Sequence, residues 1–221
     1  QLSDNAFTRA FEYRNATKNE YKKRVSLPWP TTELSPNSFP IDSLPFQPVD
    51  FESTDITELI AKCEIDHSVS PVADTQGGTT PGYQRWVSFK SKQLTEYANH
   101  RNDPLLHGVS RMSAYIHYGM VSPMRLARES AELGHAGADK YLDELLFWRE
   151  LAFVFCFHEK EHDHWNAIPN WAKKTLKAHE EDQRPVVYSW ETLARAQTND
   201  DFWNAAQLTL LRHGELHNNL R

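Results

Sequence analysis

Hydrophobic side chains along this chain of 221 residues recur mainly at helical spacing. From Tyr83 onwards they return every three or four residues, as on one face of an α-helix. The stretch 141–157 is apolar on nearly every face, which predicts a buried central helix. Shorter helices are expected over 165–179, 189–197 and 203–211. No segment alternates with the period of two that marks a strand, so the pattern predicts an all-α fold.

Residues that begin, end or interrupt helices divide the chain. Ser122 followed by Pro123 is typical of a helix start, and Gly214 is typical of a helix end. Six of the 12 prolines fall between positions 28 and 48, and proline donates no backbone hydrogen bond. We therefore expect an extended, irregular connector over 25–55.

Shorter elements flank this connector. The sequence predicts a polar helix over 6–23, a short amphipathic helix over 53–63 and a second loop over 68–82. These boundaries predict a leader with short helices over 1–82, which the family resemblance described below implies to be of interdomain type, and a helical domain over 83–221.

Composition then narrows the class of protein. Apolar residues make up 39% of the chain and aromatic residues 12%, which suffices for a core and excludes wholesale disorder. Two cysteines exclude a disulfide scaffold. No apolar run approaches the roughly 18 residues of a membrane span, and no signal peptide is visible, so no membrane partner is expected.

Charge is uneven along the chain. The net charge is −6, yet 85–128 holds seven basic and two acidic residues, a local balance of +5. Such a face can bind phosphate by releasing counterions. The alternative is a solvated helix face, which charge alone favours.

A zinc motif is the first chemical candidate. His158-Glu159-Lys160-Glu161-His162 fits H-E-x-x-H, in which two histidines on one helical turn bind zinc. The continuation lacks the glycine and third histidine of the longer form of this motif, and a solvated helix end explains the segment. A zinc hydrolase is therefore the alternative from another class, and no metal is expected.

Two further segments carry polar groups that need an explanation. Ser110 and Ser113 precede a helical turn, where hydroxyl and N–H groups can hold a phosphate. Tyr141, Glu144 and Trp148 share one helix face. A carboxylate on a buried helix needs a polar partner or a cavity, and an ion pair with a nearby arginine is the alternative to a functional role.

Five motifs in order resemble the photolyase/cryptochrome flavoproteins, specifically their helical FAD-binding domain, and are most similar to class II cyclobutane-pyrimidine-dimer photolyases. The resemblance covers 83–221 clearly and the leader loosely. The motifs are Tyr97-x-x-x-Arg101, Ser110-Arg111-Met112-Ser113-x-Tyr115-x-His117-x-Gly119, Glu144-Leu145-Leu146-x-Trp148-Arg149-Glu150, Trp203-Asn204-Ala205-Ala206-Gln207 and His217-Asn218-x-Leu220-Arg221.

The resemblance implies a role for each matching residue. Glu144, Trp148 and Asn218 match the catalytic positions, with the carboxylate toward the dimer and the indole stacking on it. Trp203 matches an electron relay. The implied FAD-binding residues are Tyr97, Val109, Ser110, Arg111, Met112, Ser113, Tyr141 and Arg221, with Val109 where many members have threonine. The implied DNA-binding residues are Arg101, Glu144, Trp148, Arg149, Asn218 and Asn219.

The implied function is light-driven DNA repair. An excited, reduced FAD would give an electron to a flipped-out cyclobutane pyrimidine dimer and split it, because a dimer cannot be reached inside the duplex. Within the family, the alternatives are a cryptochrome-type blue-light photoreceptor and an inactive, truncated FAD-domain fragment. The pair Glu144 and Trp148 favours repair, since a sensor does not need it.

Two departures from the family pattern imply a fragment. The amino-terminal α/β domain, which would carry any antenna chromophore, has no counterpart, and the chain stops inside its last motif. The resemblance further implies UV-damaged DNA as the partner and a monomer. It also implies an intracellular location, the cytoplasm in a bacterium and the nucleus or an organelle in a eukaryote.

Overall fold

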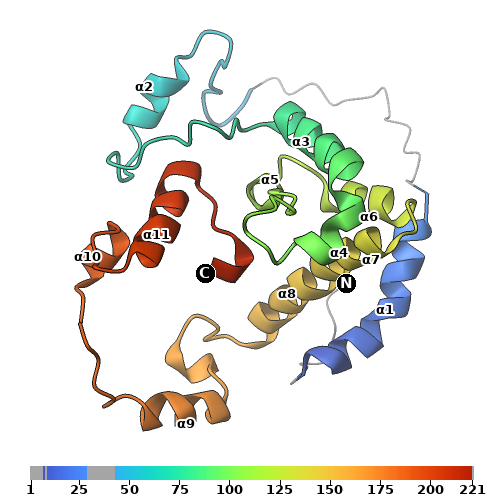
Figure 1. The fold of residues 1–221 in the computed structure, drawn as a ribbon. Coiled ribbons are helices and arrows are strands. Elements are labelled where there is room, and N and C mark those ends of the chain that lie inside the picture. The colour runs from blue at the N-terminus through green and yellow to red at the C-terminus, as the bar shows by residue number, and fades with distance from the viewer. Residues whose placement is uncertain (1–6, 8, 29–42, 221) are drawn as a thin grey trace. The chain divides into compact units, whose positions relative to one another are not determined.

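A computed structural model of the chain describes Phe7, residues 9–28 and residues 43–220. Every regular element in these ranges is a helix, and none is a strand, which confirms the predicted all-α fold (Figure 1). The elements in chain order are α1 (Ala10–Ser26), α2 (Ile56–Ala61), α3 (Thr79–Lys92), η1 (Leu94–Glu96), α4 (Tyr97–His100), α5 (Ser113–His117), α6 (Pro123–Ala131), α7 (Ala136–Leu142), η2 (Asp143–Trp148), α8 (Arg149–His158), η3 (Trp165–Ala167), α9 (Asn170–Ala178), α10 (Trp190–Ala194), α11 (Asp201–His213) and η4 (Asn218–Leu220).

The chain divides into two compact units, and their boundaries differ from the predicted division at residue 82. One unit runs to Leu27 and resumes at Ala73, and the other is Pro28–Val72. Helix α1 belongs to the first unit because it packs along α6 and η2. Its Tyr13 is buried there against Phe147. Residues 29–42 of the predicted connector lie outside the described ranges.

Four aromatic rings form the centre of the larger unit. Trp86 and Phe89 of α3 pack against Tyr141 of α7, with ring centroids 5.3 and 5.6 Å away. Tyr97 of α4 meets Tyr141 edge-on at 5.5 Å. Edge-to-face pairs of this kind add to the free energy of burying the rings. This cluster joins three segments that are far apart in sequence.

A close approach of two backbones fixes α7 on this core. A Cβ atom on Gly137 would lie 2.0 Å from the carbonyl oxygen of Leu94 and 2.5 Å from that of Thr95. Only glycine lets α7 come so near to η1. The residue therefore sets the position of the helix that leads into Glu144.

Several predicted helix ends are confirmed. Ser122 caps α6, its hydroxyl accepting the backbone N–H of Arg125 at 3.3 Å. Gly214 ends α11 in the left-handed conformation with φ 64°. The helix expected over 165–179 is interrupted, since Pro169 separates η3 from α9 and cannot continue a helical hydrogen-bond ladder.

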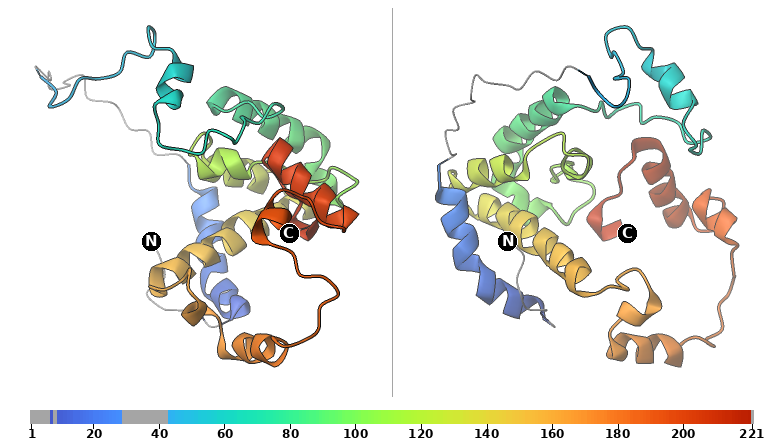
Figure 2. Two further views of the ribbon diagram at one scale, coloured as in Figure 1. Left: turned by 90° about the vertical axis from the view of Figure 1, so that its left-hand side faces the viewer. Right: turned by 180° about the vertical axis from the view of Figure 1, so that it is seen from behind.

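The predicted burial of 141–157 is wrong on one side. Helices α7, η2 and α8 do form one continuous rod (Figure 2). Phe147 and Val154 are buried against Tyr13, whereas Phe153 and Phe157 are 50% and 63% exposed. Among the described residues, α1 covers this rod along one side only.

Two other tryptophans differ widely in burial. Trp86 on α3 is fully buried, whereas Trp171 on α9 is 76% exposed. In the described ranges, no helix is both long and apolar enough to cross a bilayer.

Candidate functional site

Two cations hold the carboxylate of Glu144. Arg101, which follows α4, places Nη1 3.1 Å from Glu144 Oε1. Lys140 of α7 places Nζ 2.8 Å from the same oxygen. No described residue donates to the other oxygen, Oε2. The ion pair between Glu144 and a nearby arginine, one of the two alternatives left open by the sequence, is therefore present. It leaves one carboxylate oxygen for a ligand.

Two buried tyrosines connect this carboxylate to the serine-containing loop. Burial, and then the negative charge of Glu144, raise the pKa of Tyr97 to about 12, with Arg101 opposing them. Burial also raises the pKa of Tyr141, against a hydrogen bond with Ser110. Tyr141, whose ring meets that of Tyr97, thus links Ser110 to the residues around Glu144.

The loop before α5 is held by a group of charges, here named the Glu215 clamp and consisting of Asp74, Arg85, Arg111 and Glu215. Arg111 has φ 54°, a left-handed conformation that is uncommon outside glycine. Its Nε bonds to Glu215 Oε2, and its Nη2 lies 3.6 Å from Asp74 Oδ2. Arg85 Nη1 donates to Glu215 Oε1 at 3.2 Å. Hydrogen bonding to Glu215 raises the pKa of Arg111, against the effect of its burial.

The last motif docks beside Arg101. The side-chain amide of Asn219 donates to the carbonyl of Asn102 at 2.6 Å. The Nδ1 of His217 accepts the backbone N–H of Asn219 at 3.2 Å. The Nε2 atom of His217 is buried and has no hydrogen-bond partner among the described residues. Asn218 is exposed, and Arg221 lies outside the described ranges.

Three other predicted residues have their described partners outside this cluster. Trp148 is 45% exposed and meets Phe147 edge-on at 4.8 Å. Arg149 pairs with Glu150 at 2.5 Å. Trp203 donates its indole N–H to the carbonyl of Leu193 at 3.1 Å.

The motif that contains Trp203 has a structural use in this fold. Asn204 donates to the carbonyl of Thr198 at 2.7 Å and accepts its backbone N–H at 3.0 Å. Gln207 donates to the carbonyl of Ala194 at 2.9 Å. These bonds fasten α11 to the segment that follows α10.

Comparison with known proteins finds curated relatives that share one name. No family model matches the chain. It is 34% identical over 176 residues to a deoxyribodipyrimidine photo-lyase of Potorous tridactylus, covering 78% of this chain and 33% of that protein. It is 37% identical over 137 residues to the photo-lyase of Oryza sativa subsp. japonica, covering 60% of this chain and 27% of that protein. It is 32% identical over 182 residues to the photo-lyase of Methanothermobacter thermautotrophicus, covering 82% of this chain and 39% of that protein.

By sequence, the chain is similar to deoxyribodipyrimidine photo-lyases over 60–82% of its own length. The chain spans about a third of the length of these curated relatives. A class III photolyase from Agrobacterium tumefaciens has the same fold over 67% of this chain and 30% of its own, with a TM-score of 0.55 and 22% identity. The predicted resemblance is thereby confirmed.

Photolyases imply a flavin, and part of the site suits one. The buried Nε2 of His217 would gain a partner from a polar ligand atom, which removes the cost of leaving it unsatisfied. Ser113 is exposed and Ser110 partly so, which leaves hydroxyl groups for phosphate or ribityl oxygens. Tyr97, Met112 and Tyr141 belong to the buried core, and Val109 is partly exposed. Their contact with a flavin stays a prediction.

Charge alone favours a solvated helix face over a phosphate-binding face for 85–128, and acidic residues outside this window pair with five of its seven cations. Glu129 binds Lys90 and Arg125, and Glu215 binds Arg85 and Arg111. Glu144 likewise forms an ion pair with Arg101. Charge counted along a window of the sequence does not describe the surface, since the acidic partners lie outside the window.

The zinc alternative fails on geometry. Helix α8 ends at His158, and Glu159 is extended with φ −101° and ψ 104°. His162 is therefore not one helical turn beyond His158 on the same helix. In the part of the chain that the structure describes, no group of three or more His, Cys, Asp or Glu could hold a metal ion.

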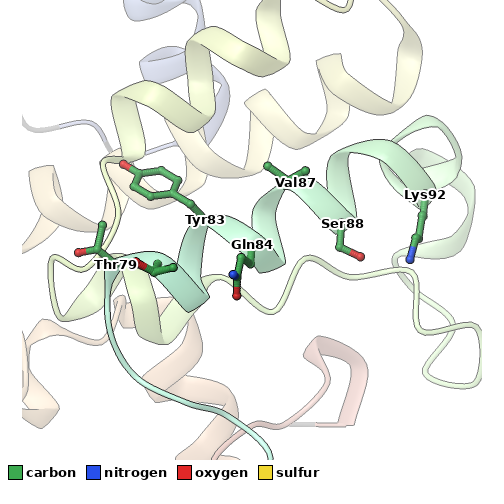
Figure 3. Close-up of a pocket in the computed structure, with 7 residues that line it drawn as sticks. Thr79, Tyr83, Gln84, Val87, Ser88 and Lys92 are labelled. Atoms are coloured by element: carbon green, nitrogen blue, oxygen red, sulfur yellow. The ribbon is translucent and has the colours of Figure 1, made fainter.

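A surface hollow lies elsewhere in the larger unit. It is open, has a volume of about 540 Å³ and is lined by α3 alone, at Thr79, Thr80, Tyr83, Gln84, Val87, Ser88 and Lys92 (Figure 3). None of these residues belongs to the predicted site.

Two contributors to the site were missed by the motifs. Lys140 stands four residues before Glu144, a spacing that predicts an ion pair on a helix. Glu215 lies between the last helix and the final motif, and no local signal links it to Arg85 or Arg111.

Proposed function

We propose that this chain is the helical, flavin-binding part of a light-driven DNA repair enzyme, a deoxyribodipyrimidine photo-lyase. The observation that carries the proposal is the similarity, at 32–37% identity, to proteins of that name from a marsupial, a plant and an archaeon. The proposed substrate is a cyclobutane pyrimidine dimer in UV-damaged DNA. The proposed state is a monomer inside the cell.

FAD would be held by the loop before α5 and by the last motif. Ser110 and Ser113 would donate to its oxygens, and His217 Nε2 would bond to one of its polar atoms. The Glu215 clamp would keep the loop in place. When bound and reduced, the flavin supplies an electron on absorbing light.

Glu144 and Trp148 would receive the lesion. A dimer must leave the base stack to be repaired, and an exposed indole offers a stacking surface in exchange. Trp148 is exposed enough for this role. Glu144 is held by Oε1, so Oε2 would accept a hydrogen bond from the lesion.

The test begins with an absorption spectrum of the purified protein after loading with FAD. Light-driven repair of an oligonucleotide with one defined thymine dimer follows. We expect bound flavin and restoration of the two thymines only under illumination. Flavin without repair would identify a photoreceptor, and failure to retain flavin would identify an inactive fragment.

A further inference from the structure

Five charged side chains alternate in sign from α1 to the end of α4. Arg14 of α1 pairs with Asp143, whose other oxygen lies 2.9 Å from Lys140 Nζ. Lys140 pairs in turn with Glu144, and Glu144 with Arg101. We name this series the charge chain. Lys140 is its centre, because it alone bonds to two carboxylates.

We infer that Lys140 is a positioning residue that fixes the carboxylate of Glu144 for recognition of the lesion. This inference rests on the proposed function and adds a residue to it. Lys140 lies outside the residues to which the sequence motifs give a role.

The geometry restricts Glu144 at one oxygen only. Lys140 Nζ and Arg101 Nη1 both approach Oε1, at 2.8 and 3.1 Å. Two donors that converge from α7 and from the end of α4 fix the direction of the carboxyl group. Oε2 is then presented to a ligand in a defined orientation, without a described donor competing for it.

Lys140 is itself restrained, which a surface lysine is not. Its ammonium is shared between Asp143 and Glu144, and the three side chains are only 17–30% exposed. Burial lowers the pKa of Lys140, but its bonds to Glu144 and Asp143 raise it overall, so the cation persists. A lysine that is free to rotate would lose entropy on binding Glu144, and the bond to Asp143 reduces that loss.

The far end of the charge chain is anchored by α1. Arg14 lies over the ring of Phe147, 4.0 Å from its centroid, and pairs with Asp143. Phe147 is buried against Tyr13 of the same helix. Asp143 is thus held between α1 and Lys140.

A double-mutant cycle tests the inference in the FAD-loaded protein. The measured quantity is the ratio of affinities for thymine-dimer DNA and undamaged DNA. We expect Lys140→Met to lower this ratio about tenfold, or 1.4 kcal/mol, and Lys140→Arg to restore most of it. In a Glu144→Gln background Lys140→Met should change the ratio less than about twofold, because Lys140 acts through Glu144.

Controls separate the possible failures. Lys174→Met on exposed α9 should leave the ratio within about twofold. If the Lys140→Met variant does not fold, the Lys140→Gln variant is used in its place. An undiminished ratio in Lys140→Met, or an equal loss in both backgrounds, overturns the inference while the proposed function stands. A wild-type ratio of one overturns the proposed function and the inference with it.

Discussion

At the scale of single residues, the carboxylate of Glu129 binds two side chains of α3. Glu129 Oε2 accepts the indole N–H of Trp86 at 2.7 Å and the ammonium of Lys90 at 2.6 Å. Its Oε1 accepts Arg125 Nε at 2.7 Å. Burial raises the pKa of Glu129, but these three donors outweigh it and hold the value at about 2. A buried tryptophan therefore has its polar atom satisfied by an ionised group.

This carboxylate should make folding stability depend on acid. The pKa of Glu129 is about 2 in the folded chain and about 4.5 when unfolded, so its contribution is complete above pH 4.5 and is lost as pH falls toward 2. We expect a loss of about 2 kcal/mol after allowance for solvent screening. Urea unfolding at pH 6, 4 and 3 measures it, and Glu129→Gln should flatten this part of the profile. A profile unaltered by the substitution would contradict the assignment.

The exposed indole of Trp148 gives a second residue-scale prediction. Removal of a stacking side chain costs about 1–3 kcal/mol per base. Trp148→Ala should therefore weaken binding of dimer-containing DNA about tenfold and leave binding of undamaged DNA nearly unchanged. Titration of both labelled duplexes measures this. Trp171→Ala, which removes a more exposed indole on α9, is the matched control. Equal weakening of both duplexes by Trp148→Ala would remove the stacking role.

At the scale of elements, the rod formed by α7, η2 and α8 shows both a success and a failure of the sequence pattern. Existence of the helix over 141–157 followed from its apolar content, and it was found. Its burial on nearly every face was not found, because α1 covers only one side of the rod. The π-helix η2 is a further difference, since it holds an additional residue in its turn whereas a helical wheel assumes 100° per residue throughout. Residues after Trp148 are thereby shifted in phase relative to Tyr141. The spacing of hydrophobic residues in the sequence does not reveal an inserted residue of this kind.

The close approach of α7 to η1 yields a prediction for an element as a whole. Gly137→Ala places a methyl group against two backbone carbonyls that cannot move aside, so α7 must shift. We expect a loss of about 3 kcal/mol in unfolding free energy. Urea denaturation followed by circular dichroism measures it.

Gly77→Ala is the control for this experiment. The added Cβ would meet only the flexible end of Met120, at 3.4 Å, so stability should stay within about 0.5 kcal/mol. Similar losses in both variants would show that the approach to η1 is not what matters.

At the scale of the molecule, distant ion pairs decide what the surface offers. Lys90 meets Glu129 across 39 positions, and Arg85 meets Glu215 across 130. Ordered motifs could identify the family and the candidate residues Tyr97, Ser110 and Glu144, which do come together. Local charge could not reveal that the arginines are paired, because a window contains no information on residues brought in by the fold.

The Glu215 clamp supplies the corresponding test. Glu215→Gln removes the charge that binds Arg85 and Arg111, and we expect it to lower stability by about 1 kcal/mol. Tryptic cleavage after Arg212 should also become faster, because the segment 214–220 is less firmly held. Glu191→Gln breaks an exposed pair with Arg195 and should alter neither measurement. Unchanged cleavage in Glu215→Gln would contradict a role for the clamp in holding this segment.

The same clamp imposes an order on biosynthesis. A ribosome adds about 5–20 residues per second, so Glu215 follows Arg85 by on the order of ten seconds. The aromatic core of α3, α4 and α7 can condense within that interval. Asp74 is already present then, and its contact with Arg111 can hold the loop provisionally. The loop before α5 therefore gains its full set of ion pairs only after the aromatic core has had time to form.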